Sequence, residues 1–186
     1  RQLQVILDSR KYRDLAIPGE TAVSLYRQAL LNGITPREAL KSVRQKLHNI
    51  VAPYLGEANF KEAAADLDAA FKDGDENEIK SVCTRILESH ASSRERLGIM
   101  ETFYSQIFSL TGKPQSILDL ACGLNPFAFP WMGLPNSTNY HAFDLNLPRI
   151  ELINHYFKLE GMAPLAAHQD ILIHPQAQAD ALQAGD

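Results

Sequence analysis

The stretch Ser116-Ile-Leu-Asp-Leu-Ala-Cys-Gly-Leu-Asn-Pro126 decides the fold of this chain. Its first five residues form a short apolar run with a β-branched isoleucine, which predicts a buried strand. Ala121 and Gly123 then predict a tight turn, because small residues allow the backbone to bend and to approach a ligand closely. The loop after the strand is therefore the first candidate binding element.

Two further apolar runs follow this loop, and each leads to an acidic residue. The run over residues 140–144 ends on Asp144, and a weaker run over residues 164–168 leads to Asp170. Between them, residues 146–160 place apolar side chains at helical spacing. Strand, helix and strand in alternation predict an α/β fold whose parallel sheet has right-handed crossovers.

The sequence before residue 113 predicts helices. Thr35-Pro-Arg-Glu38 and Ser92-Ser-Arg-Glu95 are two capping boxes, and each predicts the start of a helix. The first of these helices ends before Pro53 and the second at Thr111, and further helices are predicted over residues 20–31, 60–71 and 76–89. We therefore expect a helical domain over residues 1–112 and an α/β domain over residues 113–186.

The composition is that of an ordinary globular protein, with 186 residues of which 45% are hydrophobic and 22% charged. The net charge is −4, but residues 1–60 hold nine basic and five acidic residues, whereas residues 61–186 hold nine and seventeen. The basic first third is a candidate contact for a polyanion. No apolar run is long enough for a membrane span, and the first residues lack the layout of a secretory signal. We expect a cytoplasmic protein with no membrane partner.

The two cysteines, Cys83 and Cys122, stand far apart in the chain. They form no CxxC motif and belong to no Cys/His cluster. The sequence therefore predicts free thiols, no disulfide framework and no bound metal.

Asp119, Asp144 and Asp170 define a candidate pocket. In a doubly wound sheet all three would lie at the carboxyl ends of neighbouring strands, where ligands bind. An acid that closes the second strand can accept hydrogen bonds from both hydroxyls of a ribose, and Asp170, preceded by Gln169, is placed to meet an adenine edge. The sequence thus predicts a nucleoside-binding pocket.

The glycine content of the loop narrows the class of ligand. The sequence lacks Gly-x-Gly-x-x-Gly, the motif that brings a helix N-terminus onto a pyrophosphate, and this disfavours a NAD-linked oxidoreductase. S-adenosylmethionine carries ribose and adenine without phosphates, and its sulfonium is a cation that aromatic rings could flank. Phe127, Phe129 and Trp131 follow the loop, although core packing is the favoured role for them.

Two segments of the chain resemble one known family. The loop over residues 118–126 and the upstream segment His90-Ala-Ser-Ser-Arg-Glu-Arg-Leu97 look like those of the aminoglycoside-resistance 16S ribosomal RNA methyltransferases, which modify guanine N7 in the decoding site. Weaker similarity lies at residues 9–13, 47–55 and 168–172. The resemblance implies a helical N-terminal domain that docks on ribosomal RNA, followed by a Rossmann-like, S-adenosylmethionine-dependent methyltransferase domain.

The resemblance also implies roles for residues of this chain, with S-adenosyl-L-methionine as the cofactor. Residues 121–125 would hold its methionine part, Asp144 its ribose, and Arg96 would face its carboxylate. Read without the resemblance, Arg96 is an exposed helix residue paired with a neighbouring acid, and His90 is equally a structural histidine or a ligand contact. The candidate cofactor-binding residues are Arg96, Asp119, Ala121, Gly123, Asn125, Asp144, Leu145, Gln169, Asp170 and Ile171.

The implied partner is 16S rRNA within the 30S ribosomal subunit. Phosphate contacts are expected from the basic first third of the chain. The candidate RNA-binding residues are Arg10, Lys11, Arg13, Lys41, Arg44 and Lys46. Because guanine N7 carries a lone pair and no proton, the implied reaction needs no general base and we name no catalytic residue. Positioning of the reactants would carry catalysis.

The length of the second domain adds a further expectation. Residues 114–186 are enough for about three strands, whereas a complete Rossmann-like methyltransferase domain uses roughly twice as many residues. We therefore expect the domain to be incomplete at its C-terminus. Two alternatives stay open at this point. One is a methyltransferase with the same cofactor and another RNA or a small molecule as substrate, and the other is a non-catalytic RNA-binding fragment.

Overall fold

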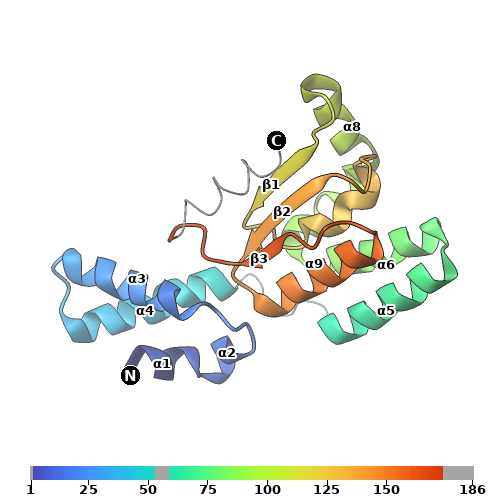
Figure 1. The fold of residues 1–186 in the computed structure, drawn as a ribbon. Helices are drawn as coiled ribbons and strands as arrows, with labels where there is room; N and C mark the ends of the chain where they lie inside the picture. Colours follow the sequence, from blue (N-terminus) through green and yellow to red (C-terminus); the bar gives the residue numbers. More distant parts are fainter. Residues whose placement is uncertain (1, 53–58, 174–186) are drawn as a thin grey trace.

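A three-stranded parallel sheet forms the centre of the α/β part of the chain (Figure 1). The structure is a computed structural model that describes residues 2–52 and 59–173, and its strand order is β1-β2-β3. The strands are β1 (Ser116–Leu120), β2 (Asn139–Asp144) and β3 (Ala166–His168), and both pairs are parallel. The parallel sheet that the sequence predicts is confirmed.

Two helical crossovers connect the strands. β1 leads to β2 through a 3₁₀ helix, η3 (Asn125–Trp131), and α9 (Leu147–Leu159) joins β2 to β3. The two crossovers contact each other, and Phe127, Tyr156 and Phe157 are fully buried between them and the sheet. The helix predicted between residues 146 and 160 is confirmed. It begins after Asn146, whose side chain accepts a hydrogen bond from Arg149 N at 3.1 Å.

β3 is shorter than the apolar run over residues 164–168 predicts. Leu165 N donates to Ala163 O at 2.9 Å, which turns the chain just before the strand. The Asn154 side chain of α9 then binds both backbone groups of Ala166, accepting from its N at 3.0 Å and donating to its O at 2.8 Å. The strand therefore begins only at Ala166, the first residue that pairs with β2.

A second group of helices packs around this core. They are α5 (Phe60–Asp73), α6 (Glu76–Glu88), α7 (Ala91–Arg94), the 3₁₀ turn η2 (Leu97–Ile99) and α8 (Met100–Thr111). α5 lies against both α6 and α9, and α6 contacts η3. Leu67 and Leu87 of these helices are fully buried in the same core as the sheet. The helices predicted over residues 60–71 and 76–89 are confirmed.

The helix predicted from the second capping box is wrong at its N-terminus. Ser92 lies within the short α7, and its Oγ forms a hydrogen bond with His90 Nδ1 at 2.8 Å instead of capping a helix. The turn η2 then separates α7 from α8, which begins only at Met100. Because α7 begins at Ala91, Ser92 lies inside a helix and is not at an N-cap position, so it does not start the long helix. Its predicted end at Thr111 is confirmed.

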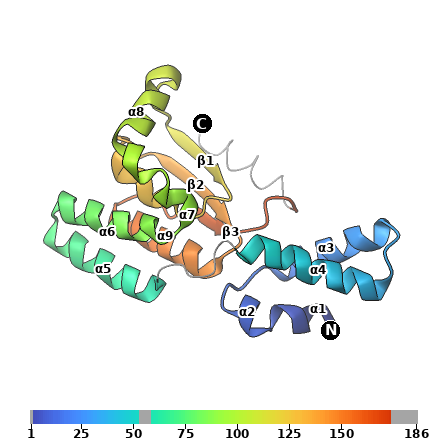
Figure 2. The same cartoon turned by 180° about the vertical axis from the view of Figure 1, so that it is seen from behind.

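The first four helices form a separate lobe to one side of the sheet (Figures 1 and 2). They are α1 (Gln2–Leu7), α2 (Arg10–Arg13), α3 (Gly19–Leu31) and α4 (Pro36–Val51). Thr35 caps α4 as predicted, accepting from Glu38 N at 3.4 Å, and Val43 and Leu47 fill a core that belongs to this lobe. The helices before residue 113 thus divide between two cores. No helix in the described ranges is long and apolar enough to cross a membrane.

Candidate functional site

The carboxyl ends of the three strands meet at a cavity of about 390 Å³. Ala121, Leu145 and Gln169 each follow one strand directly and line this cavity. A volume of this size and mainly apolar walls with a few polar groups are typical of small-molecule sites. The predicted cofactor residues in its lining are Ala121, Asp144, Leu145, Gln169, Asp170 and Ile171, whereas Arg96, Asp119, Gly123 and Asn125 are not part of that lining.

Asp144 is buried at the end of β2 and connects two neighbouring segments. Its Oδ1 accepts from Asn146 N at 2.9 Å, and its Oδ2 accepts from Gly123 N at 3.0 Å and from the Arg149 guanidinium at 2.7 Å. Arg149 is only 1% exposed, so this ion pair lies inside the protein. The carboxylate therefore ties the loop after β1 to the first turn of α9. The sequence predicts the acid as a site residue but gives no sign of its arginine partner.

The loop after β1 has the bent backbone that its small residues predict. Both Ala121 and Gly123 have positive φ angles, of 55° and 54°. For alanine this left-handed conformation costs about 1 kcal/mol or more, and such local strain is concentrated at ligand sites. Hydrogen bonds to the end of β2 hold the strained segment, since Cys122 N donates to Phe143 O at 2.9 Å. The loop is thus fixed in a bent conformation in which Ala121 borders the cavity.

Asp119 and Asn125 belong to a hydrogen-bonded network that supports the loop. Asp119 Oδ2 accepts from Tyr140 Oη at 2.7 Å and from Asn125 Nδ2 at 2.9 Å, and Tyr104 Oη donates to Asn125 Oδ1 at 2.9 Å. The pKa of Asp119 is raised above its ordinary value, because the effect of burial is larger than the opposing effects of the two hydrogen bonds and the nearby Arg96 charge. The network joins α8, β1 and β2 to the loop. The sequence motif indicates the acid and the asparagine, whereas no local signal marks either tyrosine as part of the site.

Arg96 and His90 come from the segment before α8. Arg96 is half-buried in a turn and donates from Nε to Ser92 O at 3.2 Å, and its charge lowers the pKa of Asp119. The interpretation of Arg96 as an exposed helix residue is therefore wrong, because the late start of α8 leaves it outside any helix. His90 is buried, and burial, with a smaller contribution from the Arg149 charge, lowers the pKa of its ring.

The N-terminal lobe supplies another wall of the cavity, which the sequence does not predict. Thr21 Oγ1 donates to Asp170 Oδ2 at 2.8 Å in a buried contact between residues 149 positions apart. Leu147 N also donates to Leu15 O at 3.2 Å, so the backbones of the two parts are joined. The lobe residues in the lining are Leu15, Ile17, Thr21, Leu25, Asn49, Ile50 and Val51. No local signal marks such long-range partners.

The aromatic residues after the loop pack in the core, as favoured from the sequence. Phe127 and Phe129 are buried, and the half-buried Trp131 donates from Nε1 to Glu101 at 2.9 Å. Cys83 and Cys122 are free and buried, and burial raises the pKa of both thiols, that of Cys83 to about 12. Neither is a thiolate at neutral pH. Across residues 2–52 and 59–173, no group of three or more His, Cys, Asp or Glu residues could hold a metal ion.

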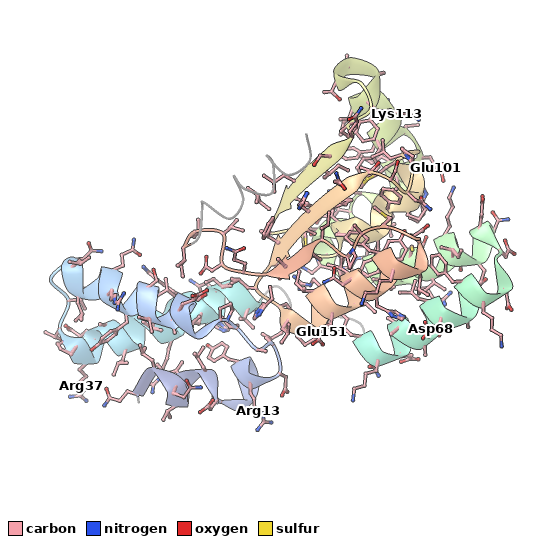
Figure 3. The ribbon with its side chains drawn as sticks, in the orientation of Figure 1. Arg13, Arg37, Asp68, Glu101, Lys113 and Glu151 are labelled. Atoms are coloured by element: carbon pink, nitrogen blue, oxygen red, sulfur yellow. The ribbon has the colours of Figure 1, made fainter. Side chains whose placement is uncertain are left out.

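The candidate RNA-binding residues whose side chains the structure describes, Arg13, Lys41, Arg44 and Lys46, do not form a single face. Lys41 and Arg44 are exposed and three residues apart on α4, so they share one side of that helix. Lys46 lies on a different side of α4, and its Nζ donates to Gln28 Oε1 at 3.4 Å. Arg13 is exposed and points away from the sheet (Figure 3). The side chains of Arg10 and Lys11 lie outside the described part of the structure.

Comparison with known sequences identifies one family. The family model described as "Ribosomal RNA methyltransferase (FmrO)" matches residues 8–183. The chain is 35% identical over 173 residues to a 16S rRNA (guanine(1405)-N(7))-methyltransferase of Micromonospora echinospora, an alignment that covers 91% of this chain and 62% of the relative. A relative of the same name from Frankia casuarinae is 36% identical, over 83% of this chain and 55% of the relative. The chain therefore spans less than two thirds of the length of these curated relatives.

Solved structures give the same result. The 16S rRNA methylase RmtB matches with a TM-score of 0.71 and 29% identity, over 95% of this chain and 66% of RmtB. The 16S rRNA methyltransferase RmtF, in complex with S-adenosyl-L-homocysteine, matches with a TM-score of 0.69 and 28% identity, over 92% of this chain and 62% of RmtF. Because nearly the whole chain is covered, the likeness extends across both the helical and the α/β parts.

Proposed function

Because the chain belongs to the FmrO family of ribosomal RNA methyltransferases, we propose that it transfers a methyl group from S-adenosylmethionine to guanine N7 in the decoding site of 16S rRNA, and so confers aminoglycoside resistance. The observation that carries the proposal is the cavity at the strand ends, which Asp144 and Asp170 line. These residues stand where a Rossmann-like fold binds the nucleoside part of its ligand. The reaction would take place in the cytoplasm, on the 30S subunit.

The residues around the cavity fit S-adenosylmethionine. Leu145 and Ile171 offer apolar walls for a flat base, and the buried carboxylate of Asp144 offers an acceptor for a ribose hydroxyl. We assign the adenine region to Leu145, Gln169, Asp170 and Ile171, the ribose to Asp144, the methionine part to residues 121–125 and the carboxylate to Arg96. Asp119 and Asn125 would act through the loop, whose course their hydrogen bonds fix.

The residues of this chain would contribute to catalysis by positioning the two reactants. S-adenosylmethionine supplies, when bound, a methyl group activated on a sulfonium. Guanine N7 has no proton to lose, so no side chain needs to act as a general base, and the gain in rate would come from holding two reactants in line. The target base would have to leave its stack to reach the cavity.

We propose that the helical part over residues 1–112 docks the ribosomal RNA and that residues 113–186 are the first part of a Rossmann-like domain. Lys41 and Arg44 support docking through the side of α4 that they share. Phosphate contacts by exposed cations position a protein on RNA without reading its sequence. Lys46 is the weakest member of the candidate set, because its ammonium already binds Gln28.

Methyl transfer to 30S subunits tests the proposal. The protein is incubated with 30S subunits and S-adenosylmethionine labelled in its methyl group, and the labelled position in 16S rRNA is mapped by chain cleavage at N7-methylguanine. We expect one labelled guanine in the decoding site. Asp144→Ala should abolish labelling, whereas Asp73→Asn, an exposed change on α5, should leave it intact.

Two other outcomes, one of the labelling assay and one of binding and thermal-stability measurements, would favour the alternatives. Label in another RNA or in a small molecule, with unlabelled 30S subunits, would replace the proposed substrate. A protein that binds RNA but gains no thermal stability from S-adenosylmethionine would be a non-catalytic RNA-binding module. Either result contradicts the proposal.

A further inference from the structure

The cavity at the strand ends lies at the joint between two parts of the chain. We propose that its occupant holds the N-terminal lobe (residues 2–52) in place against the α/β part, so that cofactor binding and ribosomal RNA binding strengthen each other. This inference rests on the proposed function, because it takes S-adenosylmethionine or its product as the occupant and 16S rRNA as the partner of the lobe.

The lobe and the α/β part have separate hydrophobic cores. Among the described residues, the core of the lobe is built from buried side chains between Ile6 and Val51, and the other core from buried side chains between Ala63 and Ala166. Neither cluster contains a residue of the other part. Two parts that share no core are held together by their interface, and relative motion is the default expectation for them. The position of the lobe is thus an equilibrium that a ligand can shift.

A buried hydrogen bond at the cavity joins the lobe to the α/β part. Thr21 Oγ1 of α3 donates to Asp170 Oδ2 at 2.8 Å, and both residues line the cavity. The other oxygen of this carboxylate, Oδ1, accepts from Leu172 N at 2.9 Å. The acid that we assign to the adenine region is therefore oriented in part by a residue of the lobe.

The walls of the cavity come from both parts of the chain. Seven of its sixteen lining residues belong to the lobe, and five of these seven are apolar. A ligand on the strand ends would contact both walls when the lobe is in place and one wall when it is not. Because burial of apolar surface favours the first arrangement, the ligand binds it more tightly and increases its population.

Helix α4 connects this cavity wall to the candidate RNA-binding surface. Its last residues, Asn49, Ile50 and Val51, line the cavity, and Lys41 and Arg44 are exposed earlier on the same helix. In both views the C-terminal end of α4 lies toward the sheet (Figures 1 and 2). About 15 Å of continuous helix separates Lys41 from Val51. The distance from the cations to the strand ends is therefore set by the position of the lobe.

Binding of the RNA makes the same demand on the lobe. Phosphates on Lys41 and Arg44 and a target guanine in the site would both be reached in one arrangement of the lobe and the strand ends. Two ligands that favour the same arrangement raise each other's affinity, by the same factor in both directions. The geometry thus couples the cofactor site to the RNA-binding surface through the lobe.

The test measures the Kd for 30S subunits by co-sedimentation, without S-adenosylhomocysteine and with it at about 100 times its Kd. Thr21→Val removes the hydroxyl donor, whereas Thr21→Ser keeps it. The matched control is Thr84→Val, because Thr84 lies on α6 outside the cavity lining, and its hydroxyl also donates, to Lys80 O at 2.8 Å. Urea unfolding and calorimetry with S-adenosylhomocysteine alone would establish the fold and the cofactor affinity of each protein.

The quantity of interest is the factor by which S-adenosylhomocysteine lowers the Kd for 30S subunits. For wild type we expect about 2-fold or more, because the competent arrangement is only partly populated without the ligand. Thr21→Val should bind each ligand alone more weakly, and its factor should exceed that of wild type by up to about 5- to 10-fold, the usual size for one hydrogen bond. Thr21→Ser and Thr84→Val should behave like wild type.

Two results would overturn the inference and leave the proposed function intact. If S-adenosylhomocysteine binds but leaves the Kd for 30S subunits unchanged in wild type and in Thr21→Val, the two sites are independent. If the factor is above 1 but equal in these two proteins, the contact of Thr21 with Asp170 does not link the sites. Folded wild type that binds no S-adenosylhomocysteine would instead contradict the proposed function, and the coupling would fall with it.

Discussion

Removal of the Arg149 guanidinium is the perturbation for which the structure makes the clearest energetic prediction. In Arg149→Met the carboxylate of Asp144 stays buried but loses a partner at 2.7 Å. Breaking a buried ion pair by removing one partner costs about 3–5 kcal/mol, and we expect about 3 kcal/mol here because Gly123 N and Asn146 N still donate to the carboxylate. For a protein of this length the melting temperature would fall by roughly 6–12 °C.

Urea unfolding of four proteins measures this effect. They are wild type, Arg149→Met, Asp144→Asn and the double variant. The double variant contains no buried charge at this point, so we expect it to recover part of the stability that Arg149→Met loses. The recovery is incomplete because the amide introduced by Asp144→Asn can accept from only one of the two backbone donors, Asn146 N and Gly123 N. A loss below about 1 kcal/mol in Arg149→Met, or a double variant as unstable as the single one, would refute the assignment of a buried, partner-dependent carboxylate.

Three further predictions concern the cavity, the loop and the pH dependence of stability. Thr21→Val should lower the free energy of unfolding by about 1–2 kcal/mol, because it leaves Asp170 without its buried hydroxyl donor, and unchanged urea unfolding would contradict this. Tyr140→Phe removes one of two donors to the carboxylate below the loop and should cost about 1–3 kcal/mol, which a calorimetric scan would detect or exclude. In the folded protein the pKa of His90 lies below its ordinary value of 6.5, so as the pH falls the ring takes up a proton in the unfolded chain before it does in the folded one. The stability that the neutral ring contributes is therefore complete above about pH 6.5 and is lost as the pH falls. His90→Gln should therefore flatten the dependence of stability on pH between 7.5 and 5.5, leaving the contribution of His141, whose pKa is also lowered by burial, and an unaltered slope would count against the assignment.

The parts of the fold that the sequence predicts correctly are those set by nearby residues. Thr35 caps α4 because its partner Glu38 N is three positions away, and the strand over residues 116–120 follows from a local apolar run. The second capping box fails for an equally physical reason. Its Ser92 lies inside the short helix α7, which begins at Ala91, and the spacing of residues does not show this earlier start.

The parts of the site that the sequence does not reveal depend on tertiary contacts. Thr21 reaches Asp170 across 149 positions, and nothing near either residue indicates the other. Arg149 would be placed on the surface from its chemical type, yet it is almost fully buried beside Asp144. The separation of Lys46 from Lys41 was within reach of sequence reasoning, because helical geometry puts residues five apart on different sides.

Calorimetric titration of the protein with S-adenosylhomocysteine tests the central claim most directly, because every proposed role depends on a nucleoside site at the strand ends. We predict one site per chain. At a ligand concentration of 100 times Kd the native state should gain about 2.7 kcal/mol, and most of this gain should be lost in Asp144→Ala. Folded protein that releases no binding heat and shows no thermal shift, or Asp144→Ala with the full gain, would contradict the account.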